Sequence, residues 1–243
     1  MTFDEVRRDW TELGEQDPLW AVYVAPGTRG GRWDVEEFFR TGQVEVEQSL
    51  THLAGLGVVP GTGTALDFGA GVGRLSNALA AHFDSVLAVD VSPTMLEQAR
   101  RLDRSGGRIT FQLNDRPDLR DVADASVDLV YSSLVLQHLP RDLAESYLRE
   151  FLRVLKPDGT AVVQVVNGPT LSLKGLIARY APFPLVAWGQ RRLLGYPAPM
   201  RMTPLPRAAV DAVLRGTGAR VLSAVPDPTY GGHWTCVRYY LAR

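Results

Sequence analysis

The stretch Ala65-Leu-Asp-Phe-Gly-Ala-Gly-Val-Gly-Arg-Leu75 decides the fold of this chain. Its first four residues form a short apolar run that is typical of a buried strand, and apolar residues recur at helical spacing after it. Between them, Gly69, Gly71 and Gly73 stand at alternate positions, which predicts a tight turn whose backbone a ligand can approach closely. A strand, a glycine turn and a helix together predict the opening of a nucleotide-binding α/β fold.

The spacing of the glycines narrows the class of ligand. A dinucleotide-binding turn would have its third glycine where this chain has Arg74, and the Gly-Lys-Ser/Thr of a phosphate-binding loop is absent. A second apolar run, residues 86–89, ends at Asp90, 17 residues after Gly73. A carboxylate at the end of that strand can accept hydrogen bonds from ribose hydroxyls. The pattern therefore predicts a site for a ribose-bearing ligand.

Four segments, in this order, resemble the class I S-adenosylmethionine (SAM)-dependent methyltransferases. Residues 67–73, Asp-Phe-Gly-Ala-Gly-Val-Gly, are similar to the first motif of that family, and residues 89–92, Val-Asp-Val-Ser, to its second. Residues 126–132 and 155–160 are similar to its fourth- and fifth-strand regions. The resemblance covers residues 64–166. It implies an enzyme that uses SAM as methyl donor and releases S-adenosylhomocysteine (SAH).

The resemblance and the alternation of apolar segments predict an α/β fold. We expect a Rossmann-like, seven-stranded, mostly parallel sheet with helices on both faces and an antiparallel last strand. Residues 1–243 are expected to form a single methyltransferase domain. It would comprise an N-terminal helical cap (1–60), a SAM-binding core (61–167), a lid insertion after the fifth strand (168–205), and a C-terminal helix with the last two strands (206–243).

The resemblance also implies which residues bind the donor. They are Gly69, Ala70, Gly71, Gly73, Arg74, Asp90, Val91, Met95, Asn114, Asp115 and Ser132. The glycine turn would present its backbone to the donor, with Arg74 near the methionine end, and Asp90 would hold the ribose hydroxyls. Val91 and Met95 would lie against the adenine ring, Asn114 and Asp115 at its edge, and Ser132 near the reacting methyl. All of them except Asp90 have a competing role in a turn or in packing.

Methyl transfer from SAM requires alignment of the acceptor more than a catalytic triad, because the donor is already reactive. His138, in the loop after the fourth expected strand, is the candidate catalytic base, since histidine accepts a proton near neutral pH. The competing interpretation is that it orders the loop or borders the donor. The four histidines and the single cysteine, Cys236, show no metal-ligand spacing, so no metal is expected.

The acceptor is less well defined by the sequence. Many enzymes that methylate amino groups of bases or of glutamine carry Asn/Asp-Pro-Pro-Tyr/Phe after the fourth strand, where this chain reads Tyr131-Ser-Ser-Leu. This difference and His138 favour O-methylation of a small molecule, such as a secondary metabolite or a sugar-containing compound. Methylation of a macromolecule (tRNA or protein) and a non-catalytic SAM-fold binding module are the alternatives.

Charge is unevenly distributed along the chain. Residues 159–210 contain no Asp or Glu and six Lys or Arg, interspersed with apolar residues. This composition favours a packed lid whose basic residues face water. An anionic acceptor beneath the lid, or peripheral contact of residues 168–205 with an anionic membrane, are the other interpretations. The cations are too few for a nucleic-acid groove, so no nucleic acid is expected as a partner.

The leader, residues 1–60, is expected to fold over the donor. Its aromatic residues Trp20, Tyr23, Trp33 and Phe39 would either line the acceptor pocket or pack the leader onto the core. No run of 18 apolar residues occurs, and the first residues lack a basic segment followed by an apolar one. We therefore expect a cytoplasmic enzyme without a transmembrane segment. The oligomeric state is left open.

Overall fold

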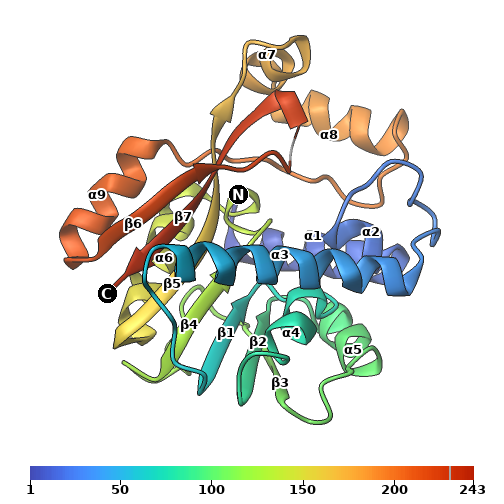
Figure 1. The fold of residues 1–243 in the computed structure, drawn as a ribbon. Helices are drawn as coiled ribbons and strands as arrows, with labels where there is room; N and C mark the ends of the chain where they lie inside the picture. The colour runs from blue at the N-terminus through green and yellow to red at the C-terminus, as the bar shows by residue number, and fades with distance from the viewer. Residues whose placement is uncertain (230) are drawn as a thin grey trace.

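The computed structural model describes residues 1–229 and 231–243, apart from the side chains of residues 174, 178, 179 and 231. The described residues form one seven-stranded sheet in the order β3-β2-β1-β4-β5-β7-β6 (Figure 1). Its strands are β1 (Thr64–Phe68), β2 (Ser85–Asp90), β3 (Ile109–Leu113), β4 (Val127–Ser132), β5 (Leu155–Pro169), β6 (Arg220–Pro226) and β7 (Trp234–Ala242). The first five are parallel, and β7 runs antiparallel between β5 and β6. The predicted α/β architecture is confirmed.

The helices occupy the leader and the connections between strands. They are α1 (Phe3–Gln16), α2 (Pro18–Val22), α3 (Val35–Gly55), α4 (Arg74–Leu79), α5 (Pro93–Arg101), α6 (Arg141–Val154), α7 (Leu173–Tyr180), α8 (Phe183–Arg192) and α9 (Arg207–Thr217), with short 3₁₀ turns η1 (Leu136–His138) and η2 (Gly231–His233). Over the described part of the chain, no helix is both long and apolar enough to cross a bilayer.

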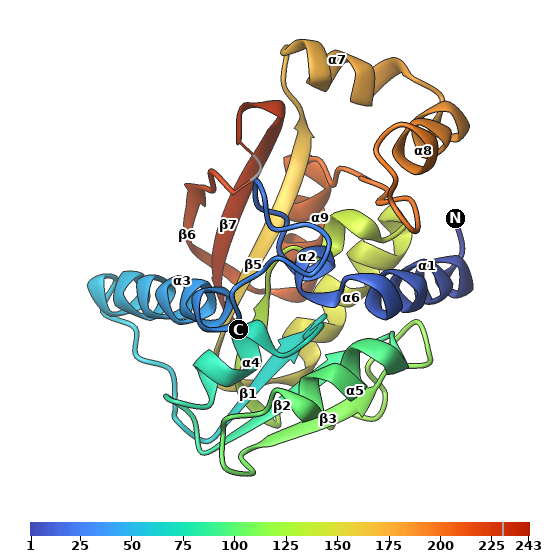
Figure 2. The same ribbon diagram turned by 90° about the vertical axis from the view of Figure 1, so that its right-hand side faces the viewer.

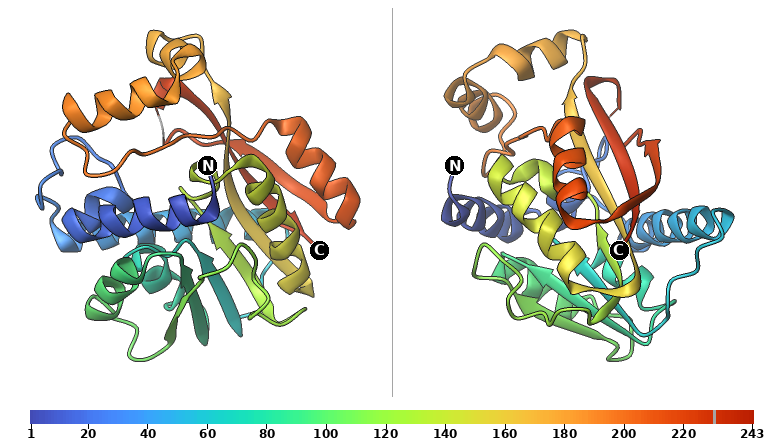
Figure 3. Two further views of the ribbon diagram at one scale, coloured as in Figure 1. Left: turned by 180° about the vertical axis from the view of Figure 1, so that it is seen from behind. Right: turned by 90° about the vertical axis from the view of Figure 1, so that its left-hand side faces the viewer.

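Helices cover both faces of the sheet, which is seen nearly edge-on in Figure 2. Successive strand residues point to opposite faces, so Leu66 and Val130 contribute to the core under α6 and α9, whereas Ala65 and Leu129 contribute to the core under α3 and α4. Seen from behind, α6 and α9 lie side by side (Figure 3). The parallel strands are buried on both sides, which explains their nearly continuous apolar sequences.

The leader contains one long helix, α3, whereas its sequence suggests two short ones, at residues 34–38 and 44–53, with Asp34 as the N-cap of the first. Asp34 does cap α3, and its carboxylate accepts a hydrogen bond from the Glu37 N–H at 2.8 Å. The helix then continues without a break to Gly55. At Gly42, α3 crosses α4: a Cβ there would lie 2.4 Å from the carbonyl oxygen of Arg74. That glycine permits a close helix crossing.

The insertion after β5 contains two helices, whereas its sequence suggests one, at residues 172–180, that Pro182 would stop. That helix is α7, and Ser172 is its N-cap. A second helix, α8, follows at once: Pro182 is its N-cap, and Pro184 lies in its first turn. Proline is well suited to that position because the first helical N–H groups have no acceptor within the helix. The proline-rich sequence therefore begins a helix.

We predict that α3 contributes to stability mainly through its buried face. Val46 is fully buried against the sheet, and Val44, in the same helix, is 39% exposed. Val46→Ala should lower the free energy of unfolding by about 1.5–3 kcal/mol, because buried methyl groups are lost and a cavity remains. Val44→Ala, the matched control, should change it by no more than about 0.5 kcal/mol. Urea denaturation measures both. Equal losses at the two positions would contradict the observed orientation of α3.

Candidate functional site

The glycine turn between β1 and α4 has a backbone that only glycine adopts easily. Gly69 and Gly71 have φ values of 76° and 54°, in the left-handed region. The N–H groups of Gly69 and Ala70 both donate to the Val89 carbonyl, at 2.8 and 3.0 Å, so the turn is fixed to the end of β2. An added Cβ would lie 2.3 Å from a methyl of Val135 at Gly69, and 2.4 Å from a methyl of Val22 at Gly71. Both glycines are therefore required for conformation and for space.

This turn forms one wall of a cavity at the carboxyl edge of the sheet, with an empty volume of about 770 Å³ including its open mouth. The ends of β2 and β3 contribute Asp90, Val91 and Asn114, and the loop after β4 contributes Ser133 and His138. The opposite wall comes from the leader, in the form of Val6 and Trp10 of α1 and Val22 of α2. Segments far apart in the sequence thus meet around one space.

Most of the donor residues expected from the sequence gather at this cavity. Those that line it are Gly69, Ala70, Gly71, Arg74, Asp90, Val91 and Asn114, together with the candidate base His138. Gly73, Met95, Asp115 and Ser132 do not line it.

The four expected donor residues outside the cavity wall have other surroundings. Gly73 is the left-handed N-cap of α4, and Met95 is buried in the contact of α5 with α1. Asp115 is exposed, with its carboxylate 3.7 Å from Arg116. Ser132 is buried, and its hydroxyl has no hydrogen-bond partner among the described residues. Donor binding by these four residues stays a prediction.

Asp90 joins the glycine turn to the next helix. One carboxylate oxygen accepts from the Gly71 N–H and the other from the Ser92 N–H, both at 2.8 Å. Burial raises the pKa of Asp90, and the backbone N–H groups around it oppose that effect. Each oxygen has a second lone pair, so the carboxylate can accept two further hydrogen bonds from a ligand.

Asn114 is held at the end of β3 by a buried tyrosine. Its side-chain amide donates to the Tyr147 hydroxyl at 2.9 Å, and that hydroxyl donates to the Arg116 carbonyl at 3.1 Å. Burial raises the pKa of Tyr147, so the phenol stays protonated and remains a donor. The amide of Asn114 is therefore held in one orientation at the cavity wall.

His138 is fixed in one tautomer by the insertion. Its Nδ1 lies 2.7 Å from the Arg201 carbonyl oxygen, and because a carbonyl can only accept, Nδ1 carries the proton. The lone pair is therefore on Nε2. Burial lowers the pKa of His138 to about 4, although the bond to Arg201 opposes that shift. The Trp10 ring packs edge-on against the imidazole, at 5.0 Å between centroids. The imidazole is thus neutral at physiological pH.

Arg74 takes part in a buried network of charges that the sequence did not indicate. One of its terminal nitrogens lies 2.8 Å from the Glu45 carboxylate of α3, and the other oxygen of Glu45 lies 2.9 Å from Arg238 of β7. Arg238 also pairs with Asp227 at 2.7 Å. Burial alone would raise the pKa of Glu45, but Arg74 and Arg238 hold it at about 2. The sequence feature that points to this network is Arg238, a charged residue within the otherwise mostly apolar strand β7.

The aromatic residues of the leader pack instead of lining the cavity. The Trp20 ring contacts Tyr196 of the insertion at 4.9 Å, and Tyr23 lies against the Arg74 guanidinium at 4.8 Å. Trp33 donates a hydrogen bond to the Tyr23 carbonyl, and Phe39 is buried. The packing alternative therefore describes all four. Trp10, Val6 and Val22, which do line the cavity, have no sequence pattern that distinguishes them from ordinary core residues.

Comparison with known proteins agrees with this arrangement. Residues 66–163 match a family model described as a methyltransferase domain. The chain is 28% identical over 155 residues to the 2-methyl-6-phytyl-1,4-hydroquinone methyltransferase of a Synechocystis species. The matched residues make up 63% of this chain and 48% of that protein. The chain is 40% identical over 110 residues to the demethylmenaquinone methyltransferase of Clavibacter sepedonicus, covering 44% and 43%. The chain spans about half the length of the curated relatives it matches.

Solved structures extend the likeness to nearly the whole chain. The magnesium protoporphyrin IX methyltransferase of Synechocystis, determined with bound SAH, superimposes with a TM-score of 0.65 at 19% identity and covers 98% of both chains. At this identity the likeness concerns the fold alone. Residues 66–163 therefore match the methyltransferase-domain family, and the chain has the same fold as this solved methyltransferase.

Proposed function

We propose that this protein is a SAM-dependent methyltransferase that acts on a hydroxyl group of a small molecule. The observation that carries the proposal is the cavity itself. It brings the glycine turn, the Asp90 carboxylate and a neutral histidine to one space at the carboxyl edge of the sheet. Open α/β sheets bind their ligands at this edge.

The residues at the cavity fit SAM. Gly69 and Gly71 border the cavity with backbone alone, so a ligand there can contact the peptide groups of the turn. Asp90 has two acceptor positions left for ribose hydroxyls, and the amide of Asn114 is held at the same wall. When bound, SAM would supply an electrophilic methyl group. The contribution of the chain is to hold the donor and to align the acceptor.

The leader and the loop after β4 would exclude water from the reaction. Val22 and Val135 lie directly over the two glycines, and Trp10 lies beside His138. An apolar wall of this kind strengthens electrostatic interactions within the site and prevents loss of the donor to hydrolysis.

His138 would hold the hydroxyl of the acceptor through Nε2. A base with a pKa of about 4 removes few protons from a free hydroxyl at neutral pH. An oxygen that is forming a third bond, however, is far more acidic than a free hydroxyl, so a weak base suffices at that point. We therefore assign His138 first an orienting role and then the role of proton acceptor.

For the methyl acceptor, we propose a chemical class and no single compound. A secondary metabolite or a sugar-containing compound with a free hydroxyl is the first candidate. A hydroquinone is the second, because the two curated relatives described above are named for quinone or hydroquinone substrates. Methylation of tRNA or protein and a purely binding role are the alternatives that the first experiment below begins to separate.

Asp90 should determine the affinity for the donor product. Asp90→Ala is expected to weaken SAH binding by at least about tenfold, because hydrogen bonds to a charged group contribute about 1.5–3 kcal/mol each. Asp84→Ala, at the opposite end of the same strand and exposed, is the matched control and should bind SAH like the wild type. Isothermal titration calorimetry measures both variants. If the folded wild type fails to bind SAH, the proposed function is wrong.

His138 should affect turnover without affecting the donor. His138→Gln is expected to lower kcat for a hydroxyl acceptor by about 10²-fold or more, the usual contribution of a positioned base. SAH affinity should be unchanged in the same protein. The assay measures SAH release from SAM with a panel of hydroxyl-bearing small molecules and hydroquinones. A wild-type kcat in the variant would contradict the role of His138. Activity on tRNA or protein alone would favour the macromolecular alternative.

The lowered pKa of His138 also predicts a pH dependence of stability. Between pH 6.5 and about 4 the unfolded chain takes up a proton at this histidine and the folded chain does not, so stability falls as the pH drops through that window. His138→Asn removes this loss. From pH 7 to pH 5 the variant should therefore lose less stability than the wild type. Urea denaturation at the two pH values measures the difference.

Other groups titrate in both proteins and cancel in that comparison, including Asp67, whose pKa burial raises to about 7. The same substitution at the exposed His82 shows what the exchange of a histidine does by itself. Identical pH dependence in the wild type and in His138→Asn would show that the imidazole is not buried as described.

A further inference from the structure

The insertion between β5 and α9 exposes its apolar side chains. Leu171, Leu173 and Ile177 around α7 are 84%, 76% and 53% exposed, and Leu185, Trp188 and Leu193 around α8 are 60%, 55% and 74% exposed. We call these six residues the insertion surface. Single exposed leucines are common, but six large exposed apolar side chains on one segment indicate a surface that something covers.

In an ordinary surface helix the apolar side faces the core, but in α7 and α8 large apolar side chains are exposed. Leu173, Leu176 and Ile177 stand at helical spacing on one side of α7, where a soluble helix would face the core. All three are exposed. Each of the ten residues of α8 is described, and none of them is buried. The apolar sides of both helices are therefore free to contact another phase.

The insertion is fixed to the domain at its base, so the exposed surface has a defined position. Arg29 of the leader donates hydrogen bonds to the carbonyls of Leu194 and Gly195, and the Leu205 N–H donates to the Val166 carbonyl at 2.8 Å. From this base, α7 and α8 project beyond the carboxyl edge of the sheet (Figures 1 and 2). The surface thus lies on the same side of the molecule as the candidate site.

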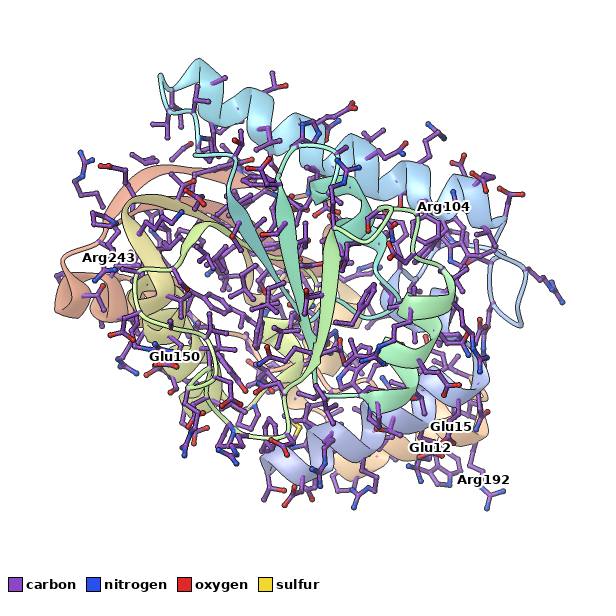
Figure 4. The ribbon with its side chains drawn as sticks, turned by 90° about the horizontal axis from the view of Figure 1, so that it is seen from below. Glu12, Glu15, Arg104, Glu150, Arg192 and Arg243 are labelled. Atoms are coloured by element: carbon purple, nitrogen blue, oxygen red, sulfur yellow. The ribbon has the colours of Figure 1, made fainter. Side chains whose placement is uncertain are left out.

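The charge of this segment indicates what covers the surface. No Asp or Glu occurs from residue 159 to residue 210, whereas six Lys or Arg do. Arg192 is exposed, and its side chain extends outward from the edge of the molecule (Figure 4). Arg191 lies 3.9 Å from Glu12 of α1, so its charge is partly balanced. The side chains of Lys174 and Arg179 lie outside those described. An acidic side chain from α1, Glu12, faces this segment. The insertion itself combines exposed apolar side chains with basic residues and no acid, which is complementary to anionic lipid headgroups over acyl chains.

We propose that the insertion surface docks on an anionic lipid bilayer, with α7 and α8 lying in the interface and their apolar side chains among the upper acyl chains. Leucine, isoleucine and tryptophan beside arginine are the residue types of interfacial helices. Neither helix is long enough to span a bilayer.

The surface is linked to the candidate site by Arg201. Its guanidinium lies over the Phe183 ring of α8 at 3.5 Å from the centroid, and its carbonyl accepts the hydrogen bond from His138. Docking would therefore hold the segment that orients the imidazole. If the proposed methyltransferase function is correct, an acceptor dissolved in the bilayer would reach the cavity from this side.

Vesicle flotation with the full-length protein tests the proposal. The wild type should float with vesicles of equal parts phosphatidylcholine and phosphatidylglycerol, float poorly with phosphatidylcholine alone, and be partly released by high salt. The double variant Ile177→Ser, Trp188→Ser should lower the fraction bound at least about tenfold, because two apolar anchors are removed. Val59→Ser is the matched control: Val59 is 81% exposed in the α3–β1 connection, at the opposite end of the sheet from α7, and should float like the wild type.

Two results would overturn the proposal. One is a wild type that does not float with anionic vesicles. The other is a wild type that sediments as a dimer and a double variant that sediments as a monomer, with neither protein floating. That result would assign the surface to contact with a second copy of this chain. SAH calorimetry on each protein separates this test from that of the proposed function. Flotation without SAH binding would support the surface and contradict the function, and SAH binding without flotation would do the reverse.

Discussion

The Glu45 carboxylate, held between two arginines, is the interaction on which the arrangement of this chain most depends. It pairs with Arg74 at 2.8 Å and with Arg238 at 2.9 Å, in a region almost closed to water. Removing Glu45 would leave Arg74 as an uncompensated buried charge, which costs about 3–5 kcal/mol, whereas removing either arginine would leave Glu45 paired with the other. The three residues come from α3, from the start of α4 and from β7. One carboxylate thus fixes the leader, the glycine-turn helix and the last strand relative to one another.

This constraint also determines how the candidate site is built. Arg74 begins the helix that follows the glycine turn, and Tyr23 of the leader covers its guanidinium. The arginine expected at the methionine end of the donor therefore pairs with Glu45, and it also borders the cavity, where its contact with the donor stays a prediction. The segment around Tyr23 also places Val22 over Gly71. The leader is consequently part of the site, because the same contacts that hold it to the core close the cavity.

The sequence was most informative where structure depends on neighbouring residues. Alternation and apolar runs identified the strands, and the turn at Gly69 and Gly71 was predictable because only glycine meets its backbone requirements. Contacts over long separations were not predictable. Nothing local to Trp10 indicates that it reaches His138, and nothing near Glu45 identifies Arg238 as its partner. Pro182 and Pro184 were misleading, because proline ends a helix in one position and begins one in another. The end of β3 shows a limit of the sequence pattern, because neighbouring residues there face different surroundings: Asn114 lines the cavity, whereas Asp115 faces solvent.

Arg201 explains why the insertion and the site should be considered together. Because the Nδ1–H of His138 donates to a backbone carbonyl, Nε2 is the only acceptor left on the ring. The position of Nε2 therefore depends on the segment to which that carbonyl belongs. That segment is the end of the insertion, and the same residue stacks on α8. Any partner that restrains α8 must therefore also restrain the orientation of the imidazole. Conversely, an insertion left free to move would allow His138 to lose its hydrogen bond, and the remaining buried imidazole would have neither a fixed tautomer nor a fixed direction. Arg201 thus connects the exposed apolar helices to His138. A segment that only covered the cavity would not need this connection.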